Sequence, residues 1–437
     1  MPPPLHRMSA TEVLNLLKDE KINVVTYARD LLDRINKRDS IVKAWTYLDS
    51  GFVLNQAKAL DQIPRGKRGP LHGLAVGVKD VVNTKDMPTQ MGSPLYKGHQ
   101  SYYDASIVGI LRAAGALIFG KTTTTEFCAA NSGPNTTNPH DPERTPGGSS
   151  CGSAAAVADF HVPIAVGAQT GGSIIRPASF TGVFALKPTY NAISPEGTKV
   201  CSSTFDTLGF LTRSIADLQL LADVFALEDD EPVQEIPLEK ATVAIVKTPN
   251  WESAGPGTIA AMERAEELLK NSGVEVHVVS FPAPLNDRDR LKHISKVIVC
   301  SEARRSFLRE YRVNKGVLGP DIRSLVENKA NFTNQDMSTA LDTLASMRPI
   351  IDKMAREYSV ILAPSAADEA PVGLEDMGSP AFNTFWTGFH VPVLNVPAFT
   401  GAHGMPISVS LVAGRFRDQH LLRIGQVLSD ALMAESD

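Results

Sequence analysis

Residues 145–177 read TPGGSSCGSAAAVADFHVPIAVGAQTGGSIIRP, and the rest of the chain is organised around this stretch. It holds two glycine-serine clusters, GGSS at 147–150 and GGS at 171–173. The Ala-rich run at 153–158 predicts a short helix, and the apolar run at 162–168 predicts a buried strand. Because a helix followed by a strand carries the chain away and back, both clusters are expected to line one pocket, where glycines permit close backbone approach.

The two clusters admit three explanations from their residues alone. GGSS could cradle a phosphate at a helix N-terminus, although the chain contains neither G-x-x-x-x-G-K-[ST] nor G-x-G-x-x-G. Two hydroxyls under glycine amides could instead supply a serine nucleophile and an oxyanion hole. Tight-turn packing is the third explanation. No G-x-S-x-G occurs with a fitting order of Asp and His, so an α/β-hydrolase triad lacks support.

A lysine interrupts the apolar run LAVGVKDVV at 74–82. Burying an ammonium group is costly unless it is paired or neutralised. Lys79 therefore has two interpretations: a strand-end lysine that reaches water or pairs with Asp80, or a desolvated lysine that acts as a base. Serine-lysine arrangements are an established variant of triad chemistry, and no histidine is singled out by its spacing.

Helical and strand patterns alternate along the chain, which predicts an α/β fold with a mixed, mostly parallel central sheet covered by helices on both faces. No Gly/Ser linker divides the pattern, so residues 1–437 are predicted to form one domain. Within it we expect an N-terminal helical layer at 1–60 and a catalytic core at 61–225. A helical region at 288–357 and a polar loop at 122–146 are expected to shape the substrate pocket.

Composition excludes several classes of protein. The net charge is −5 and no long basic stretch occurs, so nucleic acid is not an expected partner. No apolar run reaches the length of about 18 residues that a membrane span requires. The four cysteines are far apart and the N-terminus lacks a secretory apolar core, which favours the cytoplasm. The ten histidines show no metal-binding spacing.

The ordered motifs resemble the amidase signature family over nearly the whole chain. They are Lys79 after its strand, PGGSS at 146–150, TGGS at 170–173, and the ending FNTFWTGFHVPVLNVPAFTG. In detail, QTGGSIIRP and KTTTT resemble malonamidase-type members most closely.

The resemblance implies a Ser–cis-Ser–Lys triad without metal or organic cofactor. Ser173 matches the acylated nucleophile, Ser149 the bridging serine that follows a cis peptide bond, and Lys79 the base. The backbone N–H groups of Thr170, Gly171, Gly172 and Ser173 are then expected to form the oxyanion hole.

Two positions depart from the common family pattern: Gln169 replaces an aspartate before TGGS, and the arginine lies one residue later, at Arg176. In malonamidase-type members that arginine holds the substrate carboxylate, so Arg176 is either a carboxylate clamp or a structural arginine. Cys151 is expected to be a packing residue beside the site, with a reactive thiol as the alternative. Ser150 and Ser153 are predicted to be helix-cap residues.

The sequence therefore predicts an amidase that hydrolyses a small carboxamide through an acyl-serine intermediate, with a carboxylate near the scissile bond as a possible substrate feature. The partner is a small-molecule amide, and a homodimer is left open. One alternative is acyl or amide transfer with the same triad, as in an amidotransferase-like subunit. A second is a non-catalytic binding protein on this scaffold.

Overall fold

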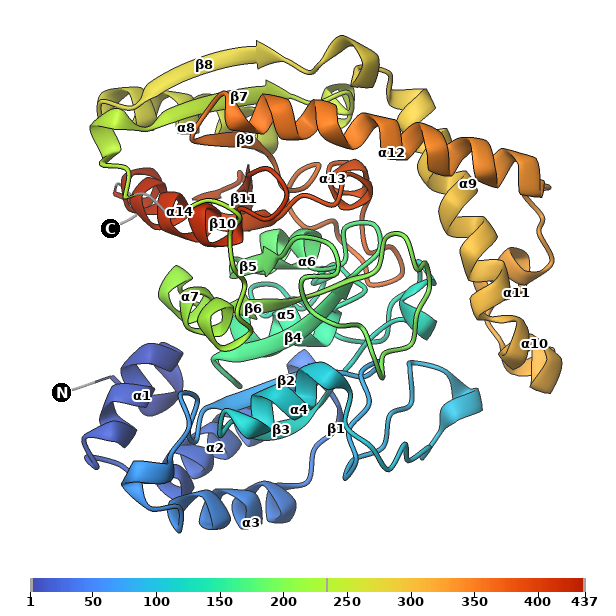
Figure 1. Ribbon diagram of the computed structural model, residues 1–437. Coiled ribbons are helices and arrows are strands. Elements are labelled where there is room, and N and C mark those ends of the chain that lie inside the picture. The colour runs from blue at the N-terminus through green and yellow to red at the C-terminus, as the bar shows by residue number, and fades with distance from the viewer. Residues whose placement is uncertain (1–2, 233–234, 435–437) are drawn as a thin grey trace.

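One continuous sheet runs through the computed structural model, which describes residues 3–232 and 235–434 (Figure 1). Within these residues it has eleven strands in the order β1-β3-β2-β4-β6-β5-β10-β11-β9-β7-β8. The strands are β1 (Trp45–Tyr47), β2 (Ala75–Lys79), β3 (Leu117–Thr122), β4 (Ile164–Gln169), β5 (Phe184–Lys187), β6 (Thr207–Thr212), β7 (Thr242–Lys247), β8 (Glu275–Ser280), β9 (Val360–Pro364), β10 (Val393–Thr400) and β11 (Pro406–Val412). Of the predicted domain 1–437, residues 1–2, 233–234 and 435–437 lie outside the described residues.

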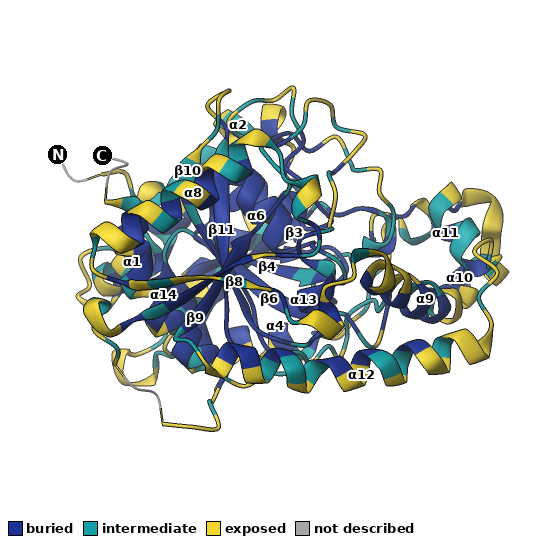
Figure 2. Ribbon diagram, turned by 90° about the horizontal axis from the view of Figure 1, so that it is seen from above, coloured by how far each residue is buried: buried dark blue, intermediate teal, exposed yellow. Residues whose placement is uncertain are grey.

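Helices cover both faces of this sheet, as the fold prediction required. They are α1 (Ala10–Lys18), α2 (Val24–Val42), α3 (Ser50–Asp61), α4 (Ser106–Ala113), α5 (Cys151–Ala158), α6 (Ile175–Thr181), α7 (Ile215–Val224), α8 (Pro256–Asn271), α9 (Arg288–Ser306), α10 (Leu308–Asn314), α11 (Pro320–Val326), α12 (Asn334–Arg356), α13 (Thr384–Gly388) and α14 (Asp418–Met433). Figure 2 shows the strands as a buried layer, with α6 and α8 on one side and α4 and α12 on the other. The single α/β domain with a mixed sheet is thus confirmed.

One detail of the fold prediction is wrong: the sheet is not mostly parallel. Among the described strands, four neighbouring pairs are parallel and six are antiparallel. Part of the reason is β6, which runs antiparallel to both β4 and β5. Another is the short connection between β10 and β11, since a parallel crossover needs a dozen or more residues.

The opening stretch folds as predicted, with α5 and β4 in place of the two runs. β4 lies parallel to β2, with Val166 opposite Val78. The carboxyl ends of parallel neighbours meet at one edge of a sheet, where α/β proteins place their ligands. Lys79 ends β2 and Gln169 ends β4, so the fold brings Lys79 to the second glycine cluster.

The region 288–357 is helical, as predicted, and comprises α9 to α12 with breaks between them. In Figure 1 these helices extend beside the sheet on the right of the view. Among the described residues, no helix combines the length and the apolar character needed to cross a membrane.

Candidate active site

Lys79 is fully buried, and within the described residues its side-chain nitrogen contacts only uncharged oxygen atoms. Nζ lies 2.8 Å from Ser149 Oγ, 2.9 Å from Ser150 Oγ and 3.0 Å from the carbonyl oxygen of Ala168. The alternative partner, Asp80, instead pairs with Lys121 at 3.2 Å. A buried lysine that has hydroxyl partners and no close carboxylate is placed to exchange protons with them.

The two serines of the first cluster sit at the start of α5. The peptide bond between Gly148 and Ser149 is cis, as the resemblance implied. The Ser150 hydroxyl, predicted to cap the helix, makes no cap hydrogen bond. This hydroxyl contacts Lys79 and the backbone of Ala168 instead, because the buried Lys79 amine at the end of β2 competes with the helix N–H groups for its oxygen. Ser150 is therefore a site residue that the sequence assigned wrongly.

The second cluster forms a turn whose carbonyl groups all have donors. Gly171 O accepts from Thr387 Oγ1 at 2.9 Å, Gly172 O accepts from the Arg176 N–H, and Ser173 O accepts from the Ser150 N–H. In contrast, the N–H groups of Gly171, Gly172 and Ser173 have no acceptor within the described part of the chain. Unpaired N–H groups beside a cavity suit a developing negative charge.

Gln169, which departs from the family pattern, stabilises this turn through hydrogen bonds of its side chain. Its side-chain oxygen accepts the N–H groups of Ile174 and Ile175 at 2.8 and 3.0 Å, and its amide donates to Thr387 Oγ1 at 3.0 Å. The sequence marked Gln169 as unusual but gave no sign of Thr387, which lies on α13 more than 200 positions away.

A half-buried carboxylate, Asp206, anchors the remaining residue of the predicted oxyanion hole. Thr170 Oγ1 donates to Asp206 Oδ1 at 2.5 Å, and the Cys201 N–H donates to Oδ2 at 2.6 Å. Burial raises the pKa of Asp206 to about 6, although these hydrogen bonds oppose the rise. The sequence did not select this aspartate, which lies directly before β6 and meets Thr170 only through the fold.

Arg176 is buried within α6 and contacts two backbone carbonyl groups. Its Nη1 donates to Gly378 O, and its Nη2 donates to Gly148 O, the carbonyl of the cis peptide bond. Its Nε has no partner in the described structure. Burial lowers the pKa of Arg176 to about 10. These contacts join the first cluster to the segment before α13.

Ser149, the 170–173 turn and Arg176 line one cavity of about 460 Å³. Loop 122–146 contributes residues 128–131 to its wall, and the region 288–357 contributes seven residues of α9 together with Leu325 of α11. No histidine is among the described residues that line it. The further lining residues are Cys128, Ala129, Ala130, Asn131, Cys201, Asn250, Ser253, Arg288, Leu291, Lys292, Ser295, Lys296, Val299, Cys300, Leu325, Met377, Ser379, Pro380, Ala381, Thr384 and Phe385.

Two neighbouring side chains lie behind the site. Cys151 is buried, contacts Thr123 and the Ser149 carbonyl, and has a pKa that burial raises, which opposes thiolate formation. Ser153, predicted to be a helix cap, donates to the Val166 carbonyl at 2.8 Å instead, because this face of α5 packs on the sheet. The described residues contain no group of His, Cys, Asp or Glu side chains arranged to hold a metal ion.

Comparison with known proteins places this arrangement in a family. The family model described as Amidase matches residues 27–422. A glutamyl-tRNA(Gln) amidotransferase subunit of Thermobifida fusca is 37% identical over 301 residues, which are 64% of this chain and 60% of that protein. The chain thus aligns with only about 60% of that relative's length.

Two further comparisons extend over nearly the whole chain. The corresponding subunit of Chloroflexus aurantiacus is 29% identical over 471 residues, covering 96% of both chains. The solved structure of an amidase superposes with a TM-score of 0.86 at 29% identity, covering 96% of this chain and 99% of its own. The resemblance to malonamidase-type members in particular stays a prediction. The family itself is confirmed: the chain belongs to the amidase family, whose enzymes act on amide bonds.

Proposed function

We propose that the chain hydrolyses small carboxamides through an acyl-enzyme intermediate on Ser173. The observation that carries the proposal is the buried contact of Lys79 with Ser149, at the edge of a cavity that Ser173 also lines. Both hydroxyls and a base are therefore available to one bound amide.

In this mechanism, neutral Lys79 takes a proton from Ser149 while Ser149 takes one from Ser173. Ser173 Oγ attacks the amide carbon, and the N–H groups of the 170–173 turn receive the negative charge on its oxygen. Each such donor is typically worth about 2.7–4 kcal/mol of the barrier. The same relay returns a proton to the leaving nitrogen, which departs as ammonia or amine. Water then attacks the acyl-serine and gives a proton to Lys79 through Ser149. Lys79 returns a proton through Ser149 to Ser173 as the carboxylic acid leaves.

The contacts of Arg176 favour a positioning role over the predicted carboxylate clamp. Both of its terminal nitrogens already donate to backbone carbonyl groups, Gly378 O and Gly148 O. A bidentate clamp needs donors in a fixed fork aimed at the ligand. We therefore propose that Arg176 holds the peptide before Ser149 in place, which aligns Ser149 with Lys79.

Replacement of the nucleophile tests the proposal. Ser173→Ala is expected to lower kcat for a simple amide by at least about 10⁴-fold and to abolish labelling by a fluorophosphonate. Ser338→Ala, which removes an exposed hydroxyl on α12, is the matched control and should leave both unchanged. Normal turnover in Ser173→Ala would contradict the mechanism.

A second candidate is transfer, with the acyl group or the released ammonia passed on within a complex. The names of the amidotransferase relatives favour it. Native mass spectrometry of the protein isolated from its source cells would reveal partner subunits and would also show whether the chain forms a homodimer. Glutamine hydrolysis that rises on addition of a co-isolated subunit would support transfer, whereas amide hydrolysis by the isolated chain alone supports the first candidate.

A further inference from the structure

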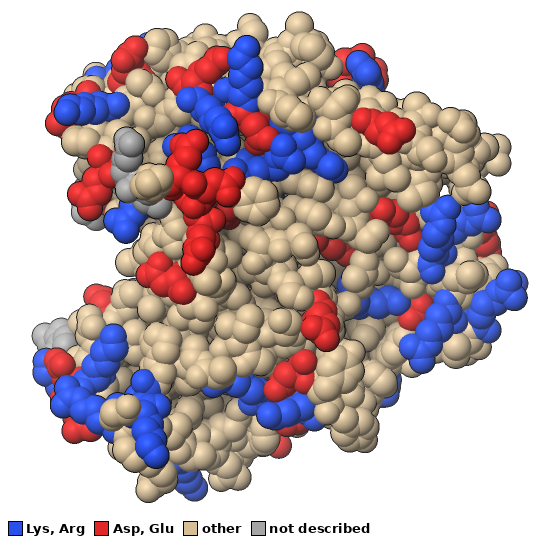
Figure 3. All heavy atoms as spheres, viewed as in Figure 1, with Lys and Arg blue, Asp and Glu red and all other residues tan. Residues whose placement is uncertain are grey.

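The lysine and arginine side chains that line the cavity have no acidic counterpart in its described lining. They are Arg176, Arg288, Lys292 and Lys296, and no Asp or Glu is among the described lining residues. This contrasts with the chain as a whole, which has 48 acidic and 43 basic residues and a net charge of −5. The excess of positive charge is therefore local to the cavity. In Figure 3, basic side chains lie on the right, at the end of the molecule with α10 and α11, and also at the top and the lower left of this face.

Three of the four cations form a row on one face of α9. Arg288, Lys292 and Lys296 follow one another at intervals of four residues, which stacks their side chains along the helix. With a rise of about 1.5 Å per residue, the row is roughly 12 Å long. Like charges at this spacing destabilise a helix, so the row is a cost to the fold rather than a support for it.

The row has little neutralisation from the protein. Lys292 and Lys296 have no carboxylate within 4.0 Å in the described chain, and both are exposed at the cavity. Arg288 lies 3.7 Å from Glu252, whose side chain is 89% exposed, so the pair is weak. Arg176, the other cation, donates through both terminal nitrogens to backbone carbonyls. The cations free to meet a ligand are therefore those on α9.

We propose that the substrate is an amide that carries an anionic group away from the scissile bond, and that the α9 row of Arg288, Lys292 and Lys296 holds this group. The inference rests on the proposed amidase function. Apolar side chains of α9 that also line the cavity, such as Leu291 and Val299, suit an aliphatic spacer.

A pair of amides of equal chain length tests the inference. We expect glutaramate to have at least a 10-fold higher kcat/KM than pentanamide in the wild type. The double variant Lys292→Gln/Lys296→Gln should lose about 10-fold for glutaramate, mainly through KM, with little change for pentanamide. Arg290→Gln/Arg304→Gln removes the same charge from α9 outside the cavity and should leave the ratio unchanged. The preference should persist in Arg176→Gln at reduced overall activity.

The outcomes separate the inference from the function beneath it. Hydrolysis of pentanamide without any preference for glutaramate, or a preference that survives in the Lys292/Lys296 variant, overturns the inference alone. Absence of both turnover and fluorophosphonate labelling of Ser173 overturns the proposed function. In that case glutarate serves as the probe: it should raise the Tm of the wild type more than that of the double variant, and equal shifts overturn the inference.

Discussion

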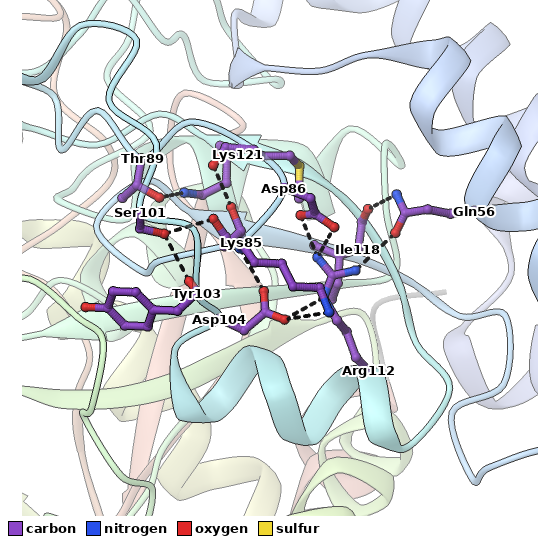
Figure 4. Close-up of polar contacts among 12 residues, drawn as sticks. Gln56, Lys85, Asp86, Thr89, Ser101, Tyr103, Asp104, Arg112, Ile118 and Lys121 are labelled. Atoms are coloured by element: carbon purple, nitrogen blue, oxygen red, sulfur yellow. Dashed lines mark hydrogen bonds and ion pairs between the residues drawn. The ribbon is translucent and has the colours of Figure 1, made fainter.

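Two fully buried lysines lie near the carboxyl ends of adjacent strands, and within the described residues Lys121 meets a carboxylate whereas Lys79 does not. Lys121 on β3 lies 3.2 Å from Asp80 and donates to Thr89 Oγ1 at 2.7 Å, as part of the polar cluster in Figure 4. Lys79 on β2 meets two serine hydroxyls and a carbonyl oxygen. Burial lowers the pKa of Lys121, and the attraction of Asp80 opposes that fall.

The comparison shows that the partners of a buried lysine, rather than its burial, indicate its role. A lysine paired with a carboxylate is held as half of an ion pair, and its proton has no path to a ligand. A lysine that contacts hydroxyl groups at a cavity edge can give and receive protons without leaving a bare charge behind. The first kind of lysine supports stability, and the second supports catalysis.

Among the lysine variants, the largest expected effect is that of Lys79→Met, and it is an effect on activity. Methionine keeps the apolar stem and removes the amine, so Ser149 loses its proton acceptor. We expect kcat to fall by about 10³-fold, the range of general acid-base catalysis, with Tm within a few degrees of the wild type. Steady-state kinetics and thermal unfolding measure the two. An unfolded variant would instead show that Lys79 supports the fold.

Strand periodicity explains why the sequence could not choose between these roles. In β2 and β3, Val78 lies opposite Lys121, so Asp80, two residues after Val78, shares the face of Lys121. Lys79 points to the other face, although it is next to Asp80 in the sequence. The pattern predicted the strand and its odd lysine, but assigning a partner required the register between two strands.

The rest of the site divides in the same way. The helix at 151–158, the strand at 164–169 and the approach of Lys79 to the first cluster could be predicted, because each follows from local periodicity or from the family motifs. Thr387 and the α9 cations could not, since they reach the site through contacts between distant segments. Ser150 was misassigned because a serine before a helix usually caps it. Here its hydroxyl is instead hydrogen-bonded to the buried amine of Lys79.

Lys121→Met is expected to act on stability where Lys79→Met acts on activity. Removing the lysine leaves Asp80 buried without its charge partner, which costs about 3–5 kcal/mol of unfolding free energy. Denaturant unfolding measures the loss. Lys121→Met combined with Asp80→Asn should recover part of it, because no unpaired charge remains. If both variants lose the same stability, the ion pair is not the cause.

A third buried lysine, Lys187, extends the comparison to the pH dependence of stability. Its Nζ donates to the carbonyls of Pro188 and Val391 at 2.8 and 2.6 Å, and burial lowers its pKa to about 7 from 10.5. Between these values the unfolded chain binds more protons than the folded one, so stability rises with pH and is lost as pH falls through about 7.

The expected gain from Lys187 is about 1.5–2 kcal/mol between pH 7 and 8.5. Lys187→Met should remove this slope while catalysis persists, because Lys187 does not line the cavity. Urea unfolding at several pH values gives the change of unfolding free energy with pH for the wild type and for Lys187→Met. Other titrating groups contribute equally to both proteins and cancel in the difference. Parallel slopes would contradict the assignment.

The smallest effect is expected at Lys85, an exposed lysine in the same polar cluster as Lys121 (Figure 4). Its ammonium lies 3.5 Å from Asp104 Oδ2, with 56% of the side chain exposed. Lys85→Gln leaves Asp104 with the Arg112 guanidinium at 3.2 Å and with the backbone N–H of residue 85. The loss should therefore stay below about 1 kcal/mol, as for other exposed pairs. A loss as large as that of Lys121→Met would show that charge pairing, without burial, governs the stability of this cluster.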